Sequence, residues 1–336
     1  MVTTTPVDRS AAPASPSGFQ GPESSASGAS EAQKEKESLF SKLQGRLIRL
    51  APKPIVRRLA GPYIAGETRE EALALVRRLY AQRGLYSTVD VLGEAVTEAR
   101  ETRVFLDEYV GVLNDLGSCP YANVSIKLSA LGQGIDEDLC ARNLETLLKT
   151  AASHGQFVRF DMEDHSTVDS TLALFRRFVG KYPRIGVVLQ SRLFRTPDDV
   201  GRLADLKPSV RLCIGIYRER AGIAFQEKPA MKARMLEILA QLWANGQHVG
   251  LATHDEKVIR RALAMARGQG RGPASFEVQM LLGVPRTSLQ QELTGMGIKV
   301  RLYVPYGRQW YQYCLRRLEH NPEMASLVVK NLFRIG

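Results

Sequence analysis

The sequence predicts a (β/α)8 barrel, the TIM-type α/β fold, as the body of this 336-residue chain. Beyond residue 85, short runs rich in β-branched residues alternate with longer helical patterns eight times over. These repeats occupy about 220 residues, close to the usual size of such a barrel. A doubly wound open sheet is the alternative, and the lack of GxGxxG at any strand-to-helix turn weakens it.

The predicted elements follow one another in the order that a parallel barrel requires. We expect strands at residues 87–94, 124–132, 157–164, 185–191, 210–217, 248–255, 276–283 and 299–307. The clearest helices between them are expected at 137–152, 167–181, 229–245 and 256–267.

Two segments precede the predicted barrel, which covers residues 86–336. Residues 1–34 consist mainly of Ser, Ala, Pro, Gly and Thr, so we expect a disordered N-terminal tail. Residues 35–85 are expected to form extra N-terminal helices that pack on the barrel. The first of them, over residues 34–59, is basic and amphipathic, and such a helix either packs on the main domain or touches a membrane surface.

The composition favours a globular protein of a reducing compartment. No apolar run approaches the roughly 20 residues that span a bilayer, and no secretory signal is recognisable, so we expect a cytoplasmic location. The four cysteines lack CxxC spacing, which argues against zinc sites and disulfides. The net charge of +11 fits anionic lipid, nucleic acid or a phosphate-bearing cofactor. Without a basic and aromatic repeat, nucleic-acid binding is a minor hypothesis.

One face of the predicted strands is unusually polar. Because side chains alternate along a strand, each run divides into two faces. The apolar face, for example Val158 and Phe160, is expected under the helices. The other face carries Lys127, Asp161, Gln190, Arg211, Tyr217, Glu277, Gln279, Arg301 and Tyr303. A lumen with so many ionisable groups is costly unless they pair or meet a polar ligand.

The carboxyl-terminal ends of the strands are where the active sites of such barrels lie. Asp161, Gln190, Tyr217, His254 and Tyr303 fall there. Singly, each has a structural explanation, such as Asp161 neutralising a lumen arginine or His254 helping to cap the next helix. Together they favour a site over a scaffold.

The segment at 301–318 joins the last predicted strand to a helix that starts near Gln309. Tyr313 lies three and four residues before Arg316 and Arg317, so a phenol and two guanidinium groups share one surface. That surface suits a small carboxylate, which arginine forks bind in a bidentate manner. A solvated basic helix end is an equally weighted alternative.

These residue types favour redox chemistry with a flavin. Asp161 with His165, and His254 with Asp255, are only fragments of a metal-ligand set, so no metal is expected. No GxSxG elbow is present for acyl transfer. An excess of cationic and amide donors suits a cofactor whose reduced form is negatively charged, and a substrate whose carboxylate needs an anchor.

From about residue 65 to residue 333 the chain resembles the proline dehydrogenases of the monofunctional bacterial type, which are flavin-dependent (β/α)8 barrels. The motifs that carry the resemblance are SIKLSALG at 125–132, FDMED at 160–164, VVLQS at 187–191, RLCIGIY at 211–217, ATHD at 252–255, FEVQMLLG at 276–283, and RLYVPYG at 301–307 followed by YCLRRL at 313–318. Seven motifs in order make coincidence improbable.

The resemblance implies that L-proline is oxidised to 1-pyrroline-5-carboxylate, the first step of proline catabolism, by hydride transfer to N5 of FAD. It implies substrate contacts at Lys127, Asp161, Tyr217, Leu281, Tyr303, Tyr313, Arg316 and Arg317. The cations would grip the carboxylate, the tyrosines and the leucine would wall in the ring, and Asp161 would order the charged groups.

The same resemblance implies FAD contacts at Gln190, Arg211, Gly215, Thr253, His254 and Gln279. Arg211 would lie by the isoalloxazine and stabilise its reduced, anionic form. The electron acceptor of the family is usually a membrane quinone, which gives the basic helix at 34–59 a hypothetical peripheral contact with the inner face of the membrane.

Ile214 and Ile216 depart from the family pattern, which usually has a basic residue and an alanine around the glycine between them. If strand alternation continues, both isoleucines face the helices. If the backbone bends at Gly215, Ile216 enters the ring pocket and Ile214 removes a positive charge near the flavin. A dehydrogenase of another cyclic imino acid is therefore one alternative. A non-catalytic basic module that binds anionic lipid or nucleic acid is the other.

Overall fold

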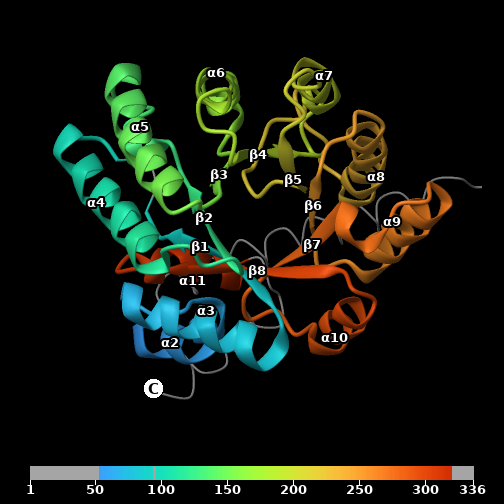
Figure 1. Cartoon of the computed structure of the whole chain (residues 1–336), viewed down its shortest axis with the longest axis horizontal. Helices are drawn as coiled ribbons and strands as arrows, with labels where there is room; N and C mark the ends of the chain where they lie inside the picture. Colours follow the sequence, from blue (N-terminus) through green and yellow to red (C-terminus); the bar gives the residue numbers. More distant parts are fainter. Residues whose placement is uncertain (1–52, 94–95, 320–336) are drawn as a thin grey trace, which may run out of the picture.

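The computed structural model describes residues 53–93 and 96–319. Eight parallel strands pair in sequence order, and the last pairs with the first to close a barrel, outside which the helices lie (Figure 1). The predicted (β/α)8 fold is confirmed. The expected tail at 1–34 lies outside the described residues.

The strands overlap all eight predicted ranges. They are β1 (Tyr86–Val91), β2 (Ala122–Ile126), β3 (Val158–Phe160), β4 (Ile185–Gln190), β5 (Ser209–Cys213), β6 (Val249–Ala252), β7 (Phe276–Leu281) and β8 (Lys299–Tyr306). The prediction was wrong at several carboxyl-terminal ends, most clearly at β2. There Ser129 donates through its backbone N–H and its hydroxyl to the Glu163 carboxylate, at 3.1 and 2.6 Å, and the chain turns into a short 3-10 helix.

The helices agree with the four predicted ones to within two residues at each end. They are α2 (Lys53–Ala60), α3 (Arg69–Arg83), α4 (Ala99–Leu116), α5 (Glu137–Ser153), α6 (Val168–Val179), α7 (Thr196–Arg202), α8 (Lys228–Ala244), α9 (Glu256–Gly268), α10 (Thr287–Gly295) and α11 (Trp310–Glu319). Two of the four begin at aspartate caps: Asp136 accepts from the Leu139 N–H of α5, and Asp255 accepts from two N–H groups of α9.

The main hydrophobic core lies between the strands and the surrounding helices. Val158 and Phe160 of β3 are fully buried, and the Phe160 ring packs edge-on against Phe175 of α6, with centroids 5.8 Å apart. Between α8 and β7, Trp243 packs in the same way against Phe276. The apolar strand faces therefore lie under the helices, as predicted, and the polar faces are left to line the lumen.

Helices precede the barrel and pack on it. α3 buries Leu73 and Val76 in the main core, and its start carries a capping box in which Thr68 and Glu71 bond each other's backbone N–H groups. Residues of α2 and α11 share a second hydrophobic cluster. Among the residues described, no helix is long and apolar enough to cross a bilayer.

Candidate active site

Lys127 and Asp90 form an ion pair where β1 and β2 end. Lys127 Nζ lies 2.6 Å from Asp90 Oδ1, and the two side chains are 12% and 1% exposed. Burial alone would lower the pKa of Lys127. The negative charge of Asp90 first, and also that of Asp161, outweighs burial and holds the pKa of Lys127 well above its usual value. Lys127 therefore stays protonated, and the Asp90 carboxylate compensates its charge.

Asp161 joins side chains from three other strands at the mouth of the lumen. Its Oδ1 accepts hydrogen bonds from the Ser125 hydroxyl and from Arg211 Nη1, both at 2.8 Å, and its Oδ2 accepts from the Tyr303 hydroxyl at 2.7 Å. The Arg211 guanidinium also lies over the Tyr303 ring, 5.2 Å from its centroid. Burial, and then the charges of Asp161 and Asp90, raise the pKa of Tyr303 well above its usual value, so it donates as a neutral phenol.

A chain of hydrogen bonds continues from Arg211 into the barrel. Arg211 Nε donates to Gln279 Oε1 at 2.5 Å, and Gln279 Nε2 donates to Glu277 Oε1 at 2.5 Å. Arg301 then grips the Glu277 carboxylate with two bonds, at 2.8 and 3.1 Å. Burial would raise the pKa of Glu277, but the charge and hydrogen bonds of Arg301 lower it to about 2. Arg211 and Arg301 are thus each neutralised by a carboxylate.

Gln190 and Gly215 form a cradle at the ends of β4 and β5. Gln190 Nε2 donates to the Glu163 carbonyl at 2.7 Å, and within the described residues its buried Oε1 has no hydrogen-bond partner. Gly215 has φ of +100°, and a Cβ at this position would overlap that oxygen. An unpaired buried acceptor beside bare backbone fits a flat ligand that carries an N–H donor, such as a flavin ring.

Thr253 and His254 follow β6 at the same mouth. The Thr253 N–H donates to the Gln279 carbonyl at 3.1 Å, which continues the ladder to β7. The Leu281 N–H donates to His254 Nε2 at 3.2 Å, which places the ring proton of a neutral His254 on Nδ1. The cap of the next helix, which was expected from His254 together with Asp255, is made by the Asp255 side chain.

The chain leaves the strand geometry directly after β5. Ile214 packs against the main core, whereas Ile216 is 38% exposed on the loop. The backbone does bend at Gly215, but neither of the two sequence-based expectations describes both isoleucines. Tyr217 is half-buried in this loop, where its carbonyl accepts a hydrogen bond from Arg192.

The aromatic and cationic residues of the last helix are only partly described. Tyr313 is buried in the second hydrophobic cluster with Val56 of α2, and the same cluster contains Leu92, which follows β1. α11 therefore packs at the carboxyl-terminal side of β1. Arg316 and Arg317 lie on α11, and their side chains are outside what the structure describes.

Asp90, the ion-pair partner of Lys127, lies in the candidate site and was not predicted from the sequence. A signal existed, since Thr88 and Asp90 alternate as polar residues along β1. Only the pairing register, in which Asp90 lies opposite Ser125, brings this carboxylate beside Lys127. In the described part of the chain, no group of three or more His, Cys, Asp or Glu side chains is placed to hold a metal.

Comparison with known proteins identifies the family. Residues 72–216 and 223–330 match the model of the proline dehydrogenase family. The chain is 37% identical over 284 residues to a proline dehydrogenase of Deinococcus radiodurans, a match that covers 82% of this chain and 90% of that protein. It is 35% identical to proline dehydrogenase 2 of Bacillus subtilis over 295 residues, or 88% of this chain and 97% of the relative.

Solved structures share the fold. The crystal structure of proline utilization A from Bdellovibrio bacteriovorus has a TM-score of 0.71 over 77% of this chain, at 22% sequence identity. The matched region is 32% of that larger protein. The family model covers β1 to β8 and the cluster around Asp161, and the two relatives match most of the chain. The chain therefore belongs to the proline dehydrogenase family.

Proposed function

We propose that the protein is an FAD-dependent oxidoreductase that converts L-proline to 1-pyrroline-5-carboxylate, the first step of proline catabolism. Family membership supports the reaction. The observation that carries the proposal is the cluster at the barrel mouth, where Asp161 bonds Arg211 and Tyr303 next to the Lys127 and Asp90 pair. This arrangement offers a small zwitterion a cation for its carboxylate and a carboxylate for its positively charged nitrogen.

The flavin would be held by groups that already surround the cradle. Gln190 would accept from a ring N–H through its unpaired Oε1, and Gly215 would let the ring approach the backbone. Arg211 would face the ring edge that gains negative charge, and Thr253, His254 and Gln279 would complete the contacts. FAD supplies the hydride acceptor, N5, for the carbon next to the proline nitrogen.

The substrate would be oriented by its carboxylate. Lys127 keeps its proton and supplies one positive charge, and Arg316 and Arg317 of α11 would supply two more. The ring would lie between the apolar and aromatic side chains Tyr217, Leu281, Tyr303 and Tyr313. Fixing one end of the molecule in this way holds the reacting carbon at one distance from the cofactor, which is the main gain from orientation.

The reduced enzyme needs an electron acceptor, for which we propose a membrane quinone. The basic segment at 34–59 would then provide a peripheral contact with anionic lipid at the inner face of the membrane. In this proposal the chain divides into a tail at 1–34, N-terminal helices at 35–85 and a catalytic barrel at 86–336. Binding to anionic vesicles that weakens with salt and is lost when residues 1–59 are removed would support the contact.

Steady-state assays with an artificial electron acceptor test the proposed substrate. We expect L-proline to give a higher kcat/KM than hydroxylated, methylated, six-membered or smaller cyclic imino acids. A matched Ile216→Ala variant should keep the same order, because Ile216 is 38% exposed. A higher kcat/KM for another imino acid would instead establish the alternative substrate, and turnover of none of them would contradict the function.

A further inference from the structure

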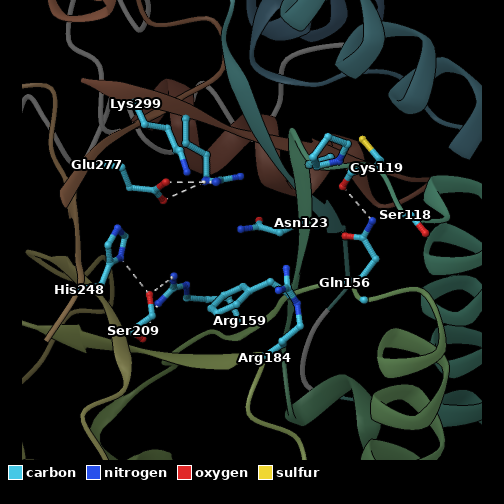
Figure 2. A pocket seen from close by; sticks show the side chains of 15 residues that line it. Ser118, Cys119, Asn123, Gln156, Arg159, Arg184, Ser209, His248, Glu277 and Lys299 are labelled. Atoms are coloured by element: carbon cyan, nitrogen blue, oxygen red, sulfur yellow. Dashed lines mark hydrogen bonds and ion pairs between the residues drawn. The ribbon is translucent and has the colours of Figure 1, made fainter. Parts of the chain in front are cut away.

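A pocket of about 410 Å³ opens at the amino-terminal end of the barrel, opposite the proposed flavin site. Residues at or just before the starts of the strands line it, among them Asn123, Ser209, His248 and Lys299, which Figure 2 shows around one cavity. Catalysis in this fold uses the other end of the strands. None of the residues proposed for proline or flavin lines this pocket.

The lining of this pocket is strongly cationic. It contains Arg159, Arg184, Lys299 and Arg301, and among the described residues that line it Glu277 is the one carboxylate. Glu277 is already engaged by Arg301 through two hydrogen bonds. The positive charges of the other three side chains therefore have no carboxylate within the lining to neutralise them.

Arg159 is the buried member of these three cations. Its side chain is 2% exposed and donates only to neutral oxygens, the carbonyls of Ser209 and Val187 at 2.8 and 3.3 Å and the Ser209 hydroxyl at 3.1 Å. No carboxylate of the described chain lies within ion-pair distance, and its Nε has no hydrogen-bond partner there. Burial first, and then repulsion from Arg211, lower the pKa of Arg159 to about 9. The more distant charges of Glu277 and Asp161 offset only part of this cost, so a buried cation with no ion-pair partner remains costly unless an anion joins it.

The rest of the pocket complements that charge. Burial lowers the pKa of His248, so this residue is neutral at pH 7 and adds no repulsion, and its ring lies 3.3 Å from the Ser209 hydroxyl. Arg184 and Lys299 are exposed at the rim, where they attract anions from solution. The volume exceeds what a single small ion needs, so several acceptor oxygens can meet several donors at once.

We propose that this pocket binds a small oxyanion that carries at least two negative charges, presented by a phosphate group or by a polycarboxylate. Arg159 provides the buried anchor, and Arg184 and Lys299 close over the exposed oxygens. A monocarboxylate offers too little charge to neutralise three cations, so it should bind far more weakly.

Isothermal titration calorimetry on the full chain, saturated with FAD so that the proposed flavin site is occupied, tests this proposal. The probes are pyrophosphate, citrate and acetate at constant ionic strength. We expect saturable one-to-one binding of pyrophosphate, citrate or both, together with a rise in melting temperature. The affinities for pyrophosphate and for citrate then show whether the site prefers a phosphate group or a polycarboxylate. Acetate should give no saturable signal.

The double variant Arg184→Gln/Lys299→Gln locates the site without touching a buried group. We expect it to weaken the Kd at least tenfold. The matched variant Arg142→Gln/Arg261→Gln removes two exposed charges from α5 and α9 and should leave the Kd unchanged. If neither polyanion binds saturably, or if both variants weaken binding equally, the proposed site is wrong. Neither readout depends on turnover of proline.

Discussion

Asp161 is the residue on which the mouth of the barrel is organised, because Ser125, Arg211 and Tyr303 all donate to its carboxylate. The Asp161→Asn variant keeps the shape but removes the charge that pairs with Arg211. A charge-assisted hydrogen bond is worth about 1.5–3 kcal/mol, so kcat/KM for L-proline should fall about 10- to 150-fold. Tyr303→Phe removes one of the three bonds and should cost less. An Asp161→Asn variant with normal kinetics and bound flavin would contradict this role.

Arg316 is predicted to be a carboxylate anchor by its motif. Arg316→Ala should raise the KM for L-proline steeply, since the carboxylate loses a charged partner worth about 1.5–3 kcal/mol. Arg308→Ala is a suitable control, because Arg308 is an exposed cation just before α11. Steady-state kinetics that give Arg316→Ala the same KM as the parent would remove Arg316 from the site.

The Glu277 and Arg301 pair should stabilise the fold in a pH-dependent way. The pKa of Glu277 falls from 4.5 to about 2 on folding, so the pair contributes fully above about pH 4.5 and loses its contribution as the pH falls toward 2. Glu277→Gln leaves Arg301 buried without a counter-charge, at a cost of about 3–5 kcal/mol near pH 7.

Urea unfolding of the parent and of Glu277→Gln near pH 6 and pH 4 checks that expectation. The difference in free energy of unfolding should be smaller at the lower pH. Glu237→Gln breaks an exposed pair with Arg234 and should change the free energy of unfolding by less than about 1 kcal/mol at both pH values. If the difference in free energy of unfolding between the parent and Glu277→Gln is instead larger at pH 4 than at pH 6, the predicted pH dependence has the wrong sign.

At the scale of single elements, the end of β5 is a tightly constrained segment of the candidate site. Gly215 has φ of +100°, and an added methyl group would overlap Gln190 Oε1. Gly215→Ala should therefore cost about 1–3 kcal/mol of backbone strain and reduce the amount of flavin retained on purification. Gly222→Ala lies in the same connection with open space around it and should retain flavin like the parent. Equal flavin content and melting temperature in both variants would contradict a tight cradle.

The elements were largely predictable because strand and helix periodicities differ along the sequence. β4 and α5 were predicted to within one residue at each end. The end of β2 was not, since Ser129 looks like a continuing polar strand position until Glu163 is known to lie beside it. The expected orientations of Ile214 and Ile216 after β5 were wrong for a similar reason. Alternation says where a side chain points only while the backbone stays extended.

At the scale of the whole molecule, the barrel combines a dry layer beneath its helices with a polar lumen. That division could be predicted from strand alternation, and the position of Asp161 and Tyr303 at one end followed from where the active sites of such barrels lie. The ion pair of Asp90 with Lys127 could not be predicted in this way, and neither could the burial of Tyr313 in a cluster that includes Val56 of α2. Both depend on contacts between distant parts of the chain, which no local pattern encodes.

The absorbance spectrum of the purified protein before and after anaerobic addition of L-proline tests the central claim most directly. The account predicts a yellow protein whose flavin absorbance is bleached by L-proline and is restored by an added electron acceptor. A protein that stays colourless after FAD is added, or a bound flavin that L-proline leaves oxidised, would contradict it.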